Sequence, residues 1–144
     1  MIKYRFTILL LLVAGSVQNS SSQELPKIRK LGNDELIQNV DSYKLISAIK
    51  TSELKIRLFE KENSSGNVGS DSVVTTSNYL IMVSQFSEPY KENLFEVGPF
   101  YLSMFVRWSG KDDRSRELTI KYGQINNKRY ITFLVSINEL KKVE

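Results

Sequence analysis

The sequence contains no cysteine and no histidine, and these two absences exclude several classes of enzyme. Without these residues the chain cannot assemble a serine-histidine-acid triad, a cysteine nucleophile, a histidine or thiolate zinc site, or a cysteine-ligated iron-sulfur cluster. It also cannot form a disulfide. Exported animal domains of this size usually carry disulfides, whereas many bacterial envelope proteins do not, so the composition favours a bacterial source.

Nucleotide-binding patterns are also lacking. The one cluster of glycines, Gly66 and Gly69, is followed by neither the lysine nor the helix of a phosphate-binding loop. No dinucleotide-binding glycine pattern occurs elsewhere. We therefore expect no cofactor, and the sequence favours a non-enzymatic protein over an enzyme.

The first 22 residues have the pattern of a secretory signal peptide. Basic residues precede an apolar core, residues 6–14, which is shorter than the roughly 20 residues that span a bilayer. Small residues just before Gln23 fit the peptidase site, with residues 14–16 as the alternative site of cleavage. We therefore expect a secreted or periplasmic protein with no stable membrane anchor after cleavage.

Cleavage would change the charge of the protein, because it removes Lys3 and Arg5 and no acidic residue. The 20 Lys and Arg of the full chain then become 18, against 16 Asp and Glu, which is a net charge of +2. The overall field of a domain this near neutrality does not draw it to polyanions. No specific nucleic-acid recognition is therefore expected.

Two segments are expected ahead of the main strands. Residues 23–32 contain a proline and several charges, which predicts a flexible leader that tethers rather than packs. Residues 33–49 begin with Asn33, a good helix cap, and carry apolar residues at helical spacing, including Tyr43, Ile46 and Ile49. We predict a helix over residues 33–49 and a single β-rich domain over residues 33–144.

Beyond residue 52 the apolar period changes to two, which is typical of half-buried strands. Leu54, Ile56 and Leu58 alternate with charged residues. The run 73–86 is rich in β-branched and aromatic residues and is apolar on both faces at its centre, which predicts a central strand. Further strands are expected at residues 94–97, 100–108, 117–122 and 129–137, followed by a solvated tail at residues 138–144.

Five or six strands joined by short polar loops favour antiparallel pairing. We therefore predict a mainly β fold: an antiparallel β-sandwich or a curved meander with one N-terminal helix packed against it. The alternative is an α+β fold in which the helix packs on an antiparallel sheet.

The charged stretch at residues 108–117 has several interpretations. Gly110, Asp112 and Asp113 are typical of the turn of a β-hairpin, and this interpretation is favoured. The two aspartates, together with Glu117 or Asp71, are also candidate calcium ligands. They are weak candidates, because the basic residues among them would repel the ion. Catalysis by this carboxylate pair is disfavoured, since neighbouring residues on a strand face apart and a loop does not desolvate them.

A further interpretation of this region is a surface that binds a glycan or an anion. Aromatic faces can stack on sugar rings while cations hold carboxylate, sulfate or phosphate groups. In the strand expected at residues 100–108, the alternating Phe100, Leu102, Met104 and Val106 supply a complete inner face and leave the intervening residues outside. The candidate binding residues are Tyr101, Phe105, Arg107, Trp108, Lys111, Arg114 and Arg116.

The function expected from these observations is that of an exported non-enzymatic binding or adaptor domain of a bacterial envelope or extracellular assembly, with a protein or glycan partner. The alternative is a small carboxylate-dependent hydrolase of extracellular polymers, which would need two acids converging in a cleft. A third hypothesis is a structural subunit that completes its sheet with a neighbour's strand, which would make the protein an oligomer.

Overall fold

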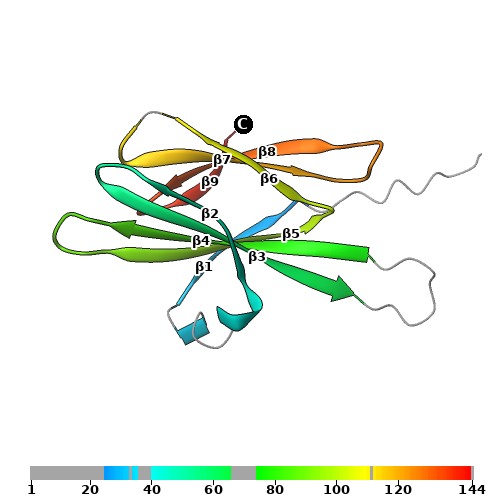
Figure 1. Ribbon diagram of the computed structural model, residues 1–144, viewed down its shortest axis with the longest axis horizontal. Coiled ribbons are helices and arrows are strands. Elements are labelled where there is room, and N and C mark those ends of the chain that lie inside the picture. The colour runs from blue at the N-terminus through cyan, green and yellow to red at the C-terminus, as the bar shows by residue number, and fades with distance from the viewer. Residues whose placement is uncertain (1–24, 33, 36–39, 66–73, 111, 144) are drawn as a thin grey trace, which may run out of the picture.

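A computed structural model describes residues 25–32, 34–35, 40–65, 74–110 and 112–143, so the expected signal peptide lies outside the described residues. The described strands form two antiparallel sheets that face each other (Figure 1). Sheet A has five strands in the order β1-β5-β4-β3-β2, and sheet B has four in the order β6-β7-β8-β9. The prediction of a mainly β, antiparallel and sandwich-like fold is confirmed, although the strands exceed the five or six expected.

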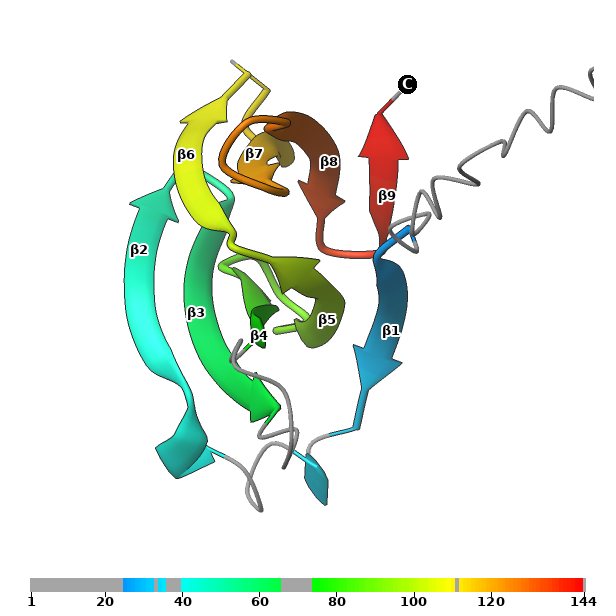
Figure 2. The same cartoon turned by 90° about the vertical axis from the view of Figure 1, so that its right-hand side faces the viewer.

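Each sheet is largely a meander. The strands of sheet A are β1 (Lys27–Leu31), β2 (Lys44–Lys50), β3 (Leu54–Ser65), β4 (Val74–Gln85) and β5 (Glu92–Tyr101). Those of sheet B are β6 (Met104–Ser109), β7 (Ser115–Tyr122), β8 (Arg129–Ser136) and β9 (Leu140–Val143). In Figure 2, β6 lies above β2 and β9 lies above β1, so the edge strands of the two sheets coincide at both sides.

The hydrophobic core lies between the sheets and is formed by alternating residues of both. Leu54, Ile56 and Leu58 of β3 are buried, as their period of two predicted. At the centre, the Phe100 side chain is 1% exposed. Its ring lies edge-on to three other rings, with centroid distances of 5.7 Å to Tyr79, 5.5 Å to Tyr122 and 6.3 Å to Phe133.

The outer face of sheet A carries a second apolar cluster. Leu80 and Met82 of β4 and Leu94 of β5 are buried there, and the side chains of Leu31, Tyr43 and Phe59 pack against them. This cluster explains why the middle of β4 is apolar on both faces. The strand lies between β3 and β5, so the prediction of a central strand is confirmed.

A half-buried carboxylate beside this cluster fastens the N-terminal segments to the sheet. Glu96 of β5 accepts hydrogen bonds from Arg29 at 2.8 Å, from the Tyr43 hydroxyl at 2.7 Å and from the Asn78 amide at 3.2 Å. Burial and the bond to Glu96 raise the pKa of Tyr43. Burial by itself would raise the pKa of Glu96, but these hydrogen bonds outweigh it and lower that pKa.

The predicted helix over residues 33–49 is wrong in its second half, because residues 44–50 form strand β2. Among the described residues of this segment, helical geometry is limited to residues 34–35 and the short 3-10 turn η1 (Val40–Ser42). Ile46 and Ile49 do pack against the core, three positions apart. This spacing arises because a β-bulge between Leu45 and Ser47 inserts one residue into the strand.

Both chain ends that were expected to lie outside the sheets contain strands. Strand β1 falls in the expected flexible leader and pairs with β5, from Lys27 opposite Gly98 to Leu31 opposite Leu94. Strand β9 falls in the expected solvated tail and pairs with β8. Within the described part of the chain, no helix is long and apolar enough to cross a membrane.

Candidate functional site

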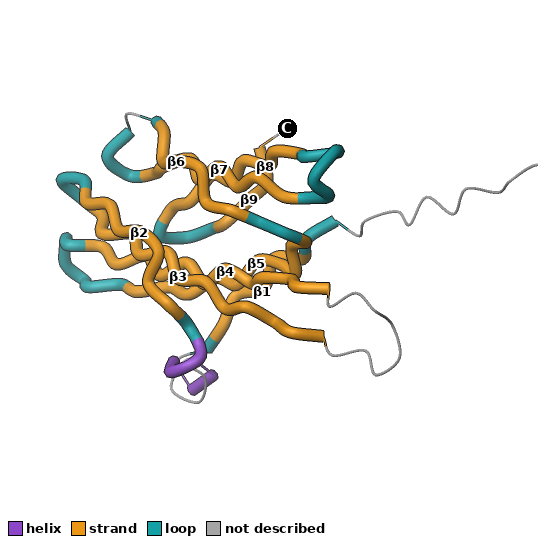
Figure 3. The backbone as a smooth tube through the Cα atoms, turned by 45° about the vertical axis from the view of Figure 1, so that its right-hand side comes forward, coloured by secondary structure: helices purple, strands orange, loops and turns teal. Residues whose placement is uncertain are grey.

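Four loops meet at one end of the two sheets, on the left-hand side of Figure 1 and drawn in teal in Figure 3. They are the β2–β3 loop (residues 51–53), the β4–β5 loop (86–91), the β6–β7 loop (110–114) and the β8–β9 loop (137–139). We call this the loop end. Antiparallel meanders return to the same end after every second strand, which is why loops so distant in sequence gather here.

Hydrogen bonds between the sheets hold these loops in place. The Thr51 hydroxyl donates to the carbonyl of Asp113 at 2.7 Å, and it also accepts from the backbone N–H of Leu54 at 2.8 Å. On the other side, the Asn93 amide donates to the carbonyl of Ile137 at 2.5 Å. The Thr51–Asp113 and Asn93–Ile137 bonds each join the part of the chain that forms sheet A to a loop of sheet B, so the loop end is fixed by contacts from both sheets.

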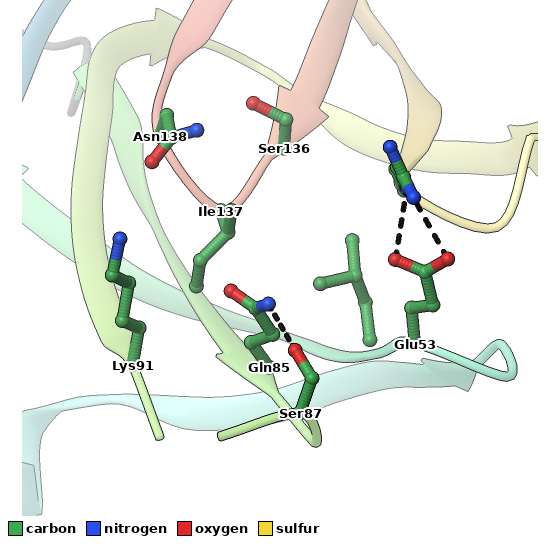
Figure 4. Close-up of a pocket in the computed structure, with 9 residues that line it drawn as sticks. Glu53, Gln85, Ser87, Lys91, Ser136, Ile137 and Asn138 are labelled. Atoms are coloured by element: carbon green, nitrogen blue, oxygen red, sulfur yellow. Dashed lines mark hydrogen bonds and ion pairs between the residues drawn. The ribbon is translucent and has the colours of Figure 1, made fainter. Parts of the chain in front are cut away.

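An open pocket of about 680 Å³ lies between these loops. Figure 4 shows Lys91, Gln85 and Ser87 on one side of it and Ser136, Ile137 and Asn138 on the other. The full lining is Glu53, Leu54, Gln85, Ser87, Lys91, Arg114, Ser136, Ile137 and Asn138. The pocket therefore combines an aliphatic part with amide, hydroxyl and charged groups.

The charge of the pocket is set by three side chains. Arg114 donates from Nε to both carboxylate oxygens of Glu53, at 3.2 and 3.1 Å, and this leaves its two terminal nitrogens without a partner among the described residues. The backbone carbonyl of Lys91 accepts a hydrogen bond from the N–H of Gln85 at 2.9 Å, but the side chains of Lys91 and Asn138 make no hydrogen bond or ion pair within the same described set. Two cations against one carboxylate give the lining a net charge of +1, with hydrogen-bond donors left over for a ligand.

The Asp112 side chain stabilises the β6–β7 turn beside this pocket. Its carboxylate accepts a hydrogen bond from the backbone N–H of Arg114 at 2.9 Å and another from the Ser115 hydroxyl at 3.1 Å. These bonds lower the pKa of Asp112. The loop joins β6 to β7 as a hairpin, with Gly110 at a φ of 92°, and the prediction of a turn is confirmed.

The described residues bring no further metal ligands to Asp112 and Asp113, so the structure does not support the calcium hypothesis. In residues 25–143, leaving aside the undescribed gaps, no three His, Cys, Asp or Glu side chains are grouped so that they could hold a metal ion. Asp112 itself is engaged by the turn, and the backbone of Asp113 accepts the Thr51 bond.

The strand predicted at residues 100–108 is divided between the two sheets. β5 ends at Tyr101, Leu102 has a φ of 43°, and β6 begins at Met104 in sheet B. The crossing reverses the faces that the sequence predicted. Leu102, Met104 and Val106, expected inside, are exposed to 38%, 58% and 38%.

Phe105 and Trp108, expected among the recognition residues, lie against the core instead. Their ring centroids are 6.0 Å apart, and the Trp108 indole N–H donates to the Ser47 hydroxyl of β2 at 3.0 Å. A bulge between Phe105 and Arg107 turns Phe105 and Trp108 inward and leaves Val106 and Arg107 outside. Of the three candidate binding residues in β6, only Arg107 is exposed.

The remaining candidate residues are also separated. Tyr101 is half-buried at the end of β5. Arg116 is half-buried in β7, where its guanidinium donates to the carbonyls of Asp112 and Ser115. Lys111 lies outside the described residues. Of the candidates with described positions, only Arg114 reaches the pocket.

Lys91 and Asn138 were not among the site residues predicted from the sequence. Both follow strands that end at the loop end, so a correct strand count would have grouped them with Arg114.

The chain matches no protein-family model, no curated protein and no solved structure.

Proposed function

We propose that the protein is an exported, non-enzymatic binding domain of a bacterial envelope or extracellular assembly, and that its loop-end pocket holds a carboxylate group of an acidic glycan. The observation that carries this proposal is the position of the Arg114 guanidinium at the pocket. Glu53 orients its guanidinium through Nε, and the terminal nitrogens stay available for an anion. Arginine binds a carboxylate in this way through two parallel hydrogen bonds.

The neighbouring groups suit a sugar. Lys91 adds a second cation, and Asn138 can both donate to and accept from sugar hydroxyls. The β4–β5 loop, which contributes Ser87 and Lys91 to the pocket, also carries Tyr90 and Phe86, exposed to 65% and 46%. The Lys50 ammonium lies 5.0 Å from the centroid of the Phe86 ring, so Tyr90 is the more accessible of the two rings for stacking. A pocket with an aliphatic part and a few polar groups is typical of small-ligand sites.

The pocket is less suited to a carboxylate-dependent hydrolase. Such an enzyme needs two carboxyl groups across the scissile bond. Among the described lining residues Glu53 is the only acid, and it is paired with Arg114. We therefore favour binding over hydrolysis.

The test uses the chain that begins at Gln23, which retains both sheets and every described core residue. Titration calorimetry with galacturonic acid oligosaccharides should give saturable binding, and Arg114→Gln should weaken that binding about tenfold or more because it removes a charge-assisted bidentate contact. Lys91→Gln should weaken it less, since lysine binds as a point charge. A neutral glucose oligosaccharide of equal length should not bind.

The matched control is Lys55→Gln, which removes one exposed cation from β3 outside the pocket lining. It should bind like the unmodified protein. Equal weakening by Lys55→Gln and Arg114→Gln would mean that only the overall charge attracts the ligand. Hydrolysis of the oligosaccharide during the titration would support the enzyme alternative and contradict the proposal.

A further inference from the structure

A second exposed feature lies at the opposite end of the molecule, where the β5–β6 connection meets the β7–β8 turn. The backbone N–H of Gly123 donates to the carbonyl of Tyr101 at 2.8 Å. The Lys128 ammonium donates to the carbonyls of Leu102 and Gly123, at 3.1 and 2.7 Å. The two connections are therefore fixed to each other and form one corner of the molecule.

Large apolar side chains protrude from this corner. Ile125 in the β7–β8 turn is 81% exposed, Tyr130 is 62% exposed and Met104 is 58% exposed, while Leu102 is exposed to 38%. Met104 and Tyr130 are register partners of Lys121, one on each side, so all three share the outer face of sheet B. We call these four apolar residues the turn corner.

The charged residues that sheet B brings to the turn corner are all positive. On the side of sheet A, the Tyr79 hydroxyl lies 3.3 Å from a carboxylate oxygen of Glu60 and 3.2 Å from the Ser103 hydroxyl, so one acid approaches the β5–β6 connection. Between Glu117 and Glu139 the sequence has no acidic residue, and its charged residues are Lys121, Lys128 and Arg129. Lys121 places its ammonium 5.7 Å from the centroid of the Tyr130 ring.

The parts of the chain that form the two sheets differ in net charge. Residues 102–144, which include all of sheet B, hold nine Lys and Arg and five Asp and Glu, a net charge of +4. Residues 23–101 hold nine basic and eleven acidic residues, a net charge of −2. The turn corner therefore belongs to the part of the chain that has a net positive charge.

We propose that the turn corner docks the protein reversibly on an anionic lipid surface. Cations near such a surface are attracted to its headgroups, and protruding apolar side chains enter the interface below them. Tyrosine is enriched at this depth because its ring is apolar and its hydroxyl stays hydrated. This contact is separate from the loop-end pocket and does not depend on the glycan proposal.

Other occupants fit the turn corner less well. A second copy docked through the same corner would bring Lys121 and Arg129 against identical cations, which is unfavourable. A protein partner would need a hydrophobic pocket that accepts the protruding Ile125, and it would also need acidic residues around that pocket. A bilayer adapts its shape to the protein, so it needs only negative charge, which the cations of the corner complement.

The experiment measures co-sedimentation with vesicles. It uses the chain from Gln23, because the apolar residues 6–14 would bind lipid by themselves. Vesicles of phosphatidylglycerol and phosphatidylcholine in equal parts should bind the protein, pure phosphatidylcholine should bind it about tenfold or more weakly, and added salt should weaken the anionic binding.

Two pairs of substitutions separate the apolar from the charged contribution. Ile125→Asn with Tyr130→Ser should reduce binding to the anionic vesicles about tenfold or more. Lys121→Gln with Arg129→Gln should remove most of the preference for anionic over neutral vesicles. The controls are Leu45→Asn, a 52% exposed leucine on β2, and Lys55→Gln on β3, and both should leave vesicle binding unchanged.

The variants replace exposed side chains, apart from the half-buried Lys121, and equal melting temperatures will show that they are folded. No binding to anionic vesicles at low salt would overturn the proposal. Losses of the same size in the corner variants and in the controls would also overturn it.

Discussion

Replacing Phe100 by alanine is expected to lower the free energy of unfolding by about 4 kcal/mol, which is typical of deleting a large aromatic side chain from a core. Phe100 is 1% exposed and lies at the centre of the core, where three aromatic rings from β4, β7 and β8 surround it. The surrounding rings belong to both sheets, so they cannot close the cavity without moving the sheets together. The measurement is urea unfolding at neutral pH, followed by the fluorescence of Trp108.

The matched control for this prediction is the same change at Phe86. That side chain is 46% exposed, and its one described ring contact is with the Lys50 ammonium, 5.0 Å from the ring centroid. Phe86→Ala should therefore change the free energy of unfolding by no more than about 0.5 kcal/mol. A loss below about 1 kcal/mol for Phe100→Ala would show that the core is packed differently from the structure.

The strands that face the core could be predicted from the sequence, because burial on one face imposes a period of two. Leu118, Ile120 and Tyr122 of β7 are buried as expected, and so are Ile131 and Phe133 of β8. The prediction failed where a strand contains a bulge. Bulges in β2 and β6 place two core-facing residues three positions apart, and one-dimensional periodicity cannot distinguish that spacing from a helical turn.

The edge strands were missed for a different reason. An edge strand is protected from pairing with other molecules by lysines and exposed polar groups, and this composition resembles that of a loop. β1 contains Lys27 and Lys30 and β9 contains Lys141 and Lys142, all exposed. Their pairing with β5 and β8 comes from backbone hydrogen bonds, which side-chain patterns do not encode.

The candidate site was only partly predictable. The charged β6–β7 loop stood out in the sequence, and Arg114 of that loop does line the pocket. Lys91 and Asn138 lie in loops of ordinary composition, and their proximity to Arg114 depends on the strand order of both sheets. Arg107 stands apart from Phe105 and Trp108 because the bulge in β6 turns the aromatic pair inward.

The two proposed contacts lie at opposite ends of the β-sheets, and this separation is relevant to an adaptor. The loop end collects the connections that precede β3, β5, β7 and β9, whereas the turn corner is built from those that precede β6 and β8. A glycan in the pocket and a lipid surface at the corner would therefore not compete for the same face. Substitutions in one site should leave the other unchanged, so the two proposals can fail independently.

Replacing Glu96 by alanine is expected to lower the free energy of unfolding by about 3 kcal/mol at neutral pH. The change removes three hydrogen bonds to a charged acceptor and leaves the half-buried Tyr43 hydroxyl and the Asn78 amide without their partner. The bond from Arg29 contributes little to this figure, because the Arg29 side chain is 60% exposed. Glu96→Gln keeps one acceptor oxygen and should lose about 2 kcal/mol.

The pH dependence of the loss in Glu96→Gln distinguishes the contribution of the carboxylate charge from that of neutral hydrogen bonding. Hydrogen bonds lower the pKa of folded Glu96 below the ordinary value of 4.5, so the charge stabilises the fold fully above that pH. The stabilisation disappears as the pH falls through the lower pKa of the folded state. The difference between the unmodified protein and Glu96→Gln should therefore shrink towards zero in acid, in urea unfolding measured from pH 7 downwards.

The control for the pH experiment is Glu62→Gln, which changes an exposed carboxyl group of β3. It should alter the free energy of unfolding by no more than about 0.5 kcal/mol at neutral pH and should leave the acid dependence of the unmodified protein in place. If the loss in Glu96→Gln were the same at every pH, the stabilisation would come from neutral hydrogen bonding, and the charge on Glu96 would have no part in fastening β1 and Tyr43 to sheet A.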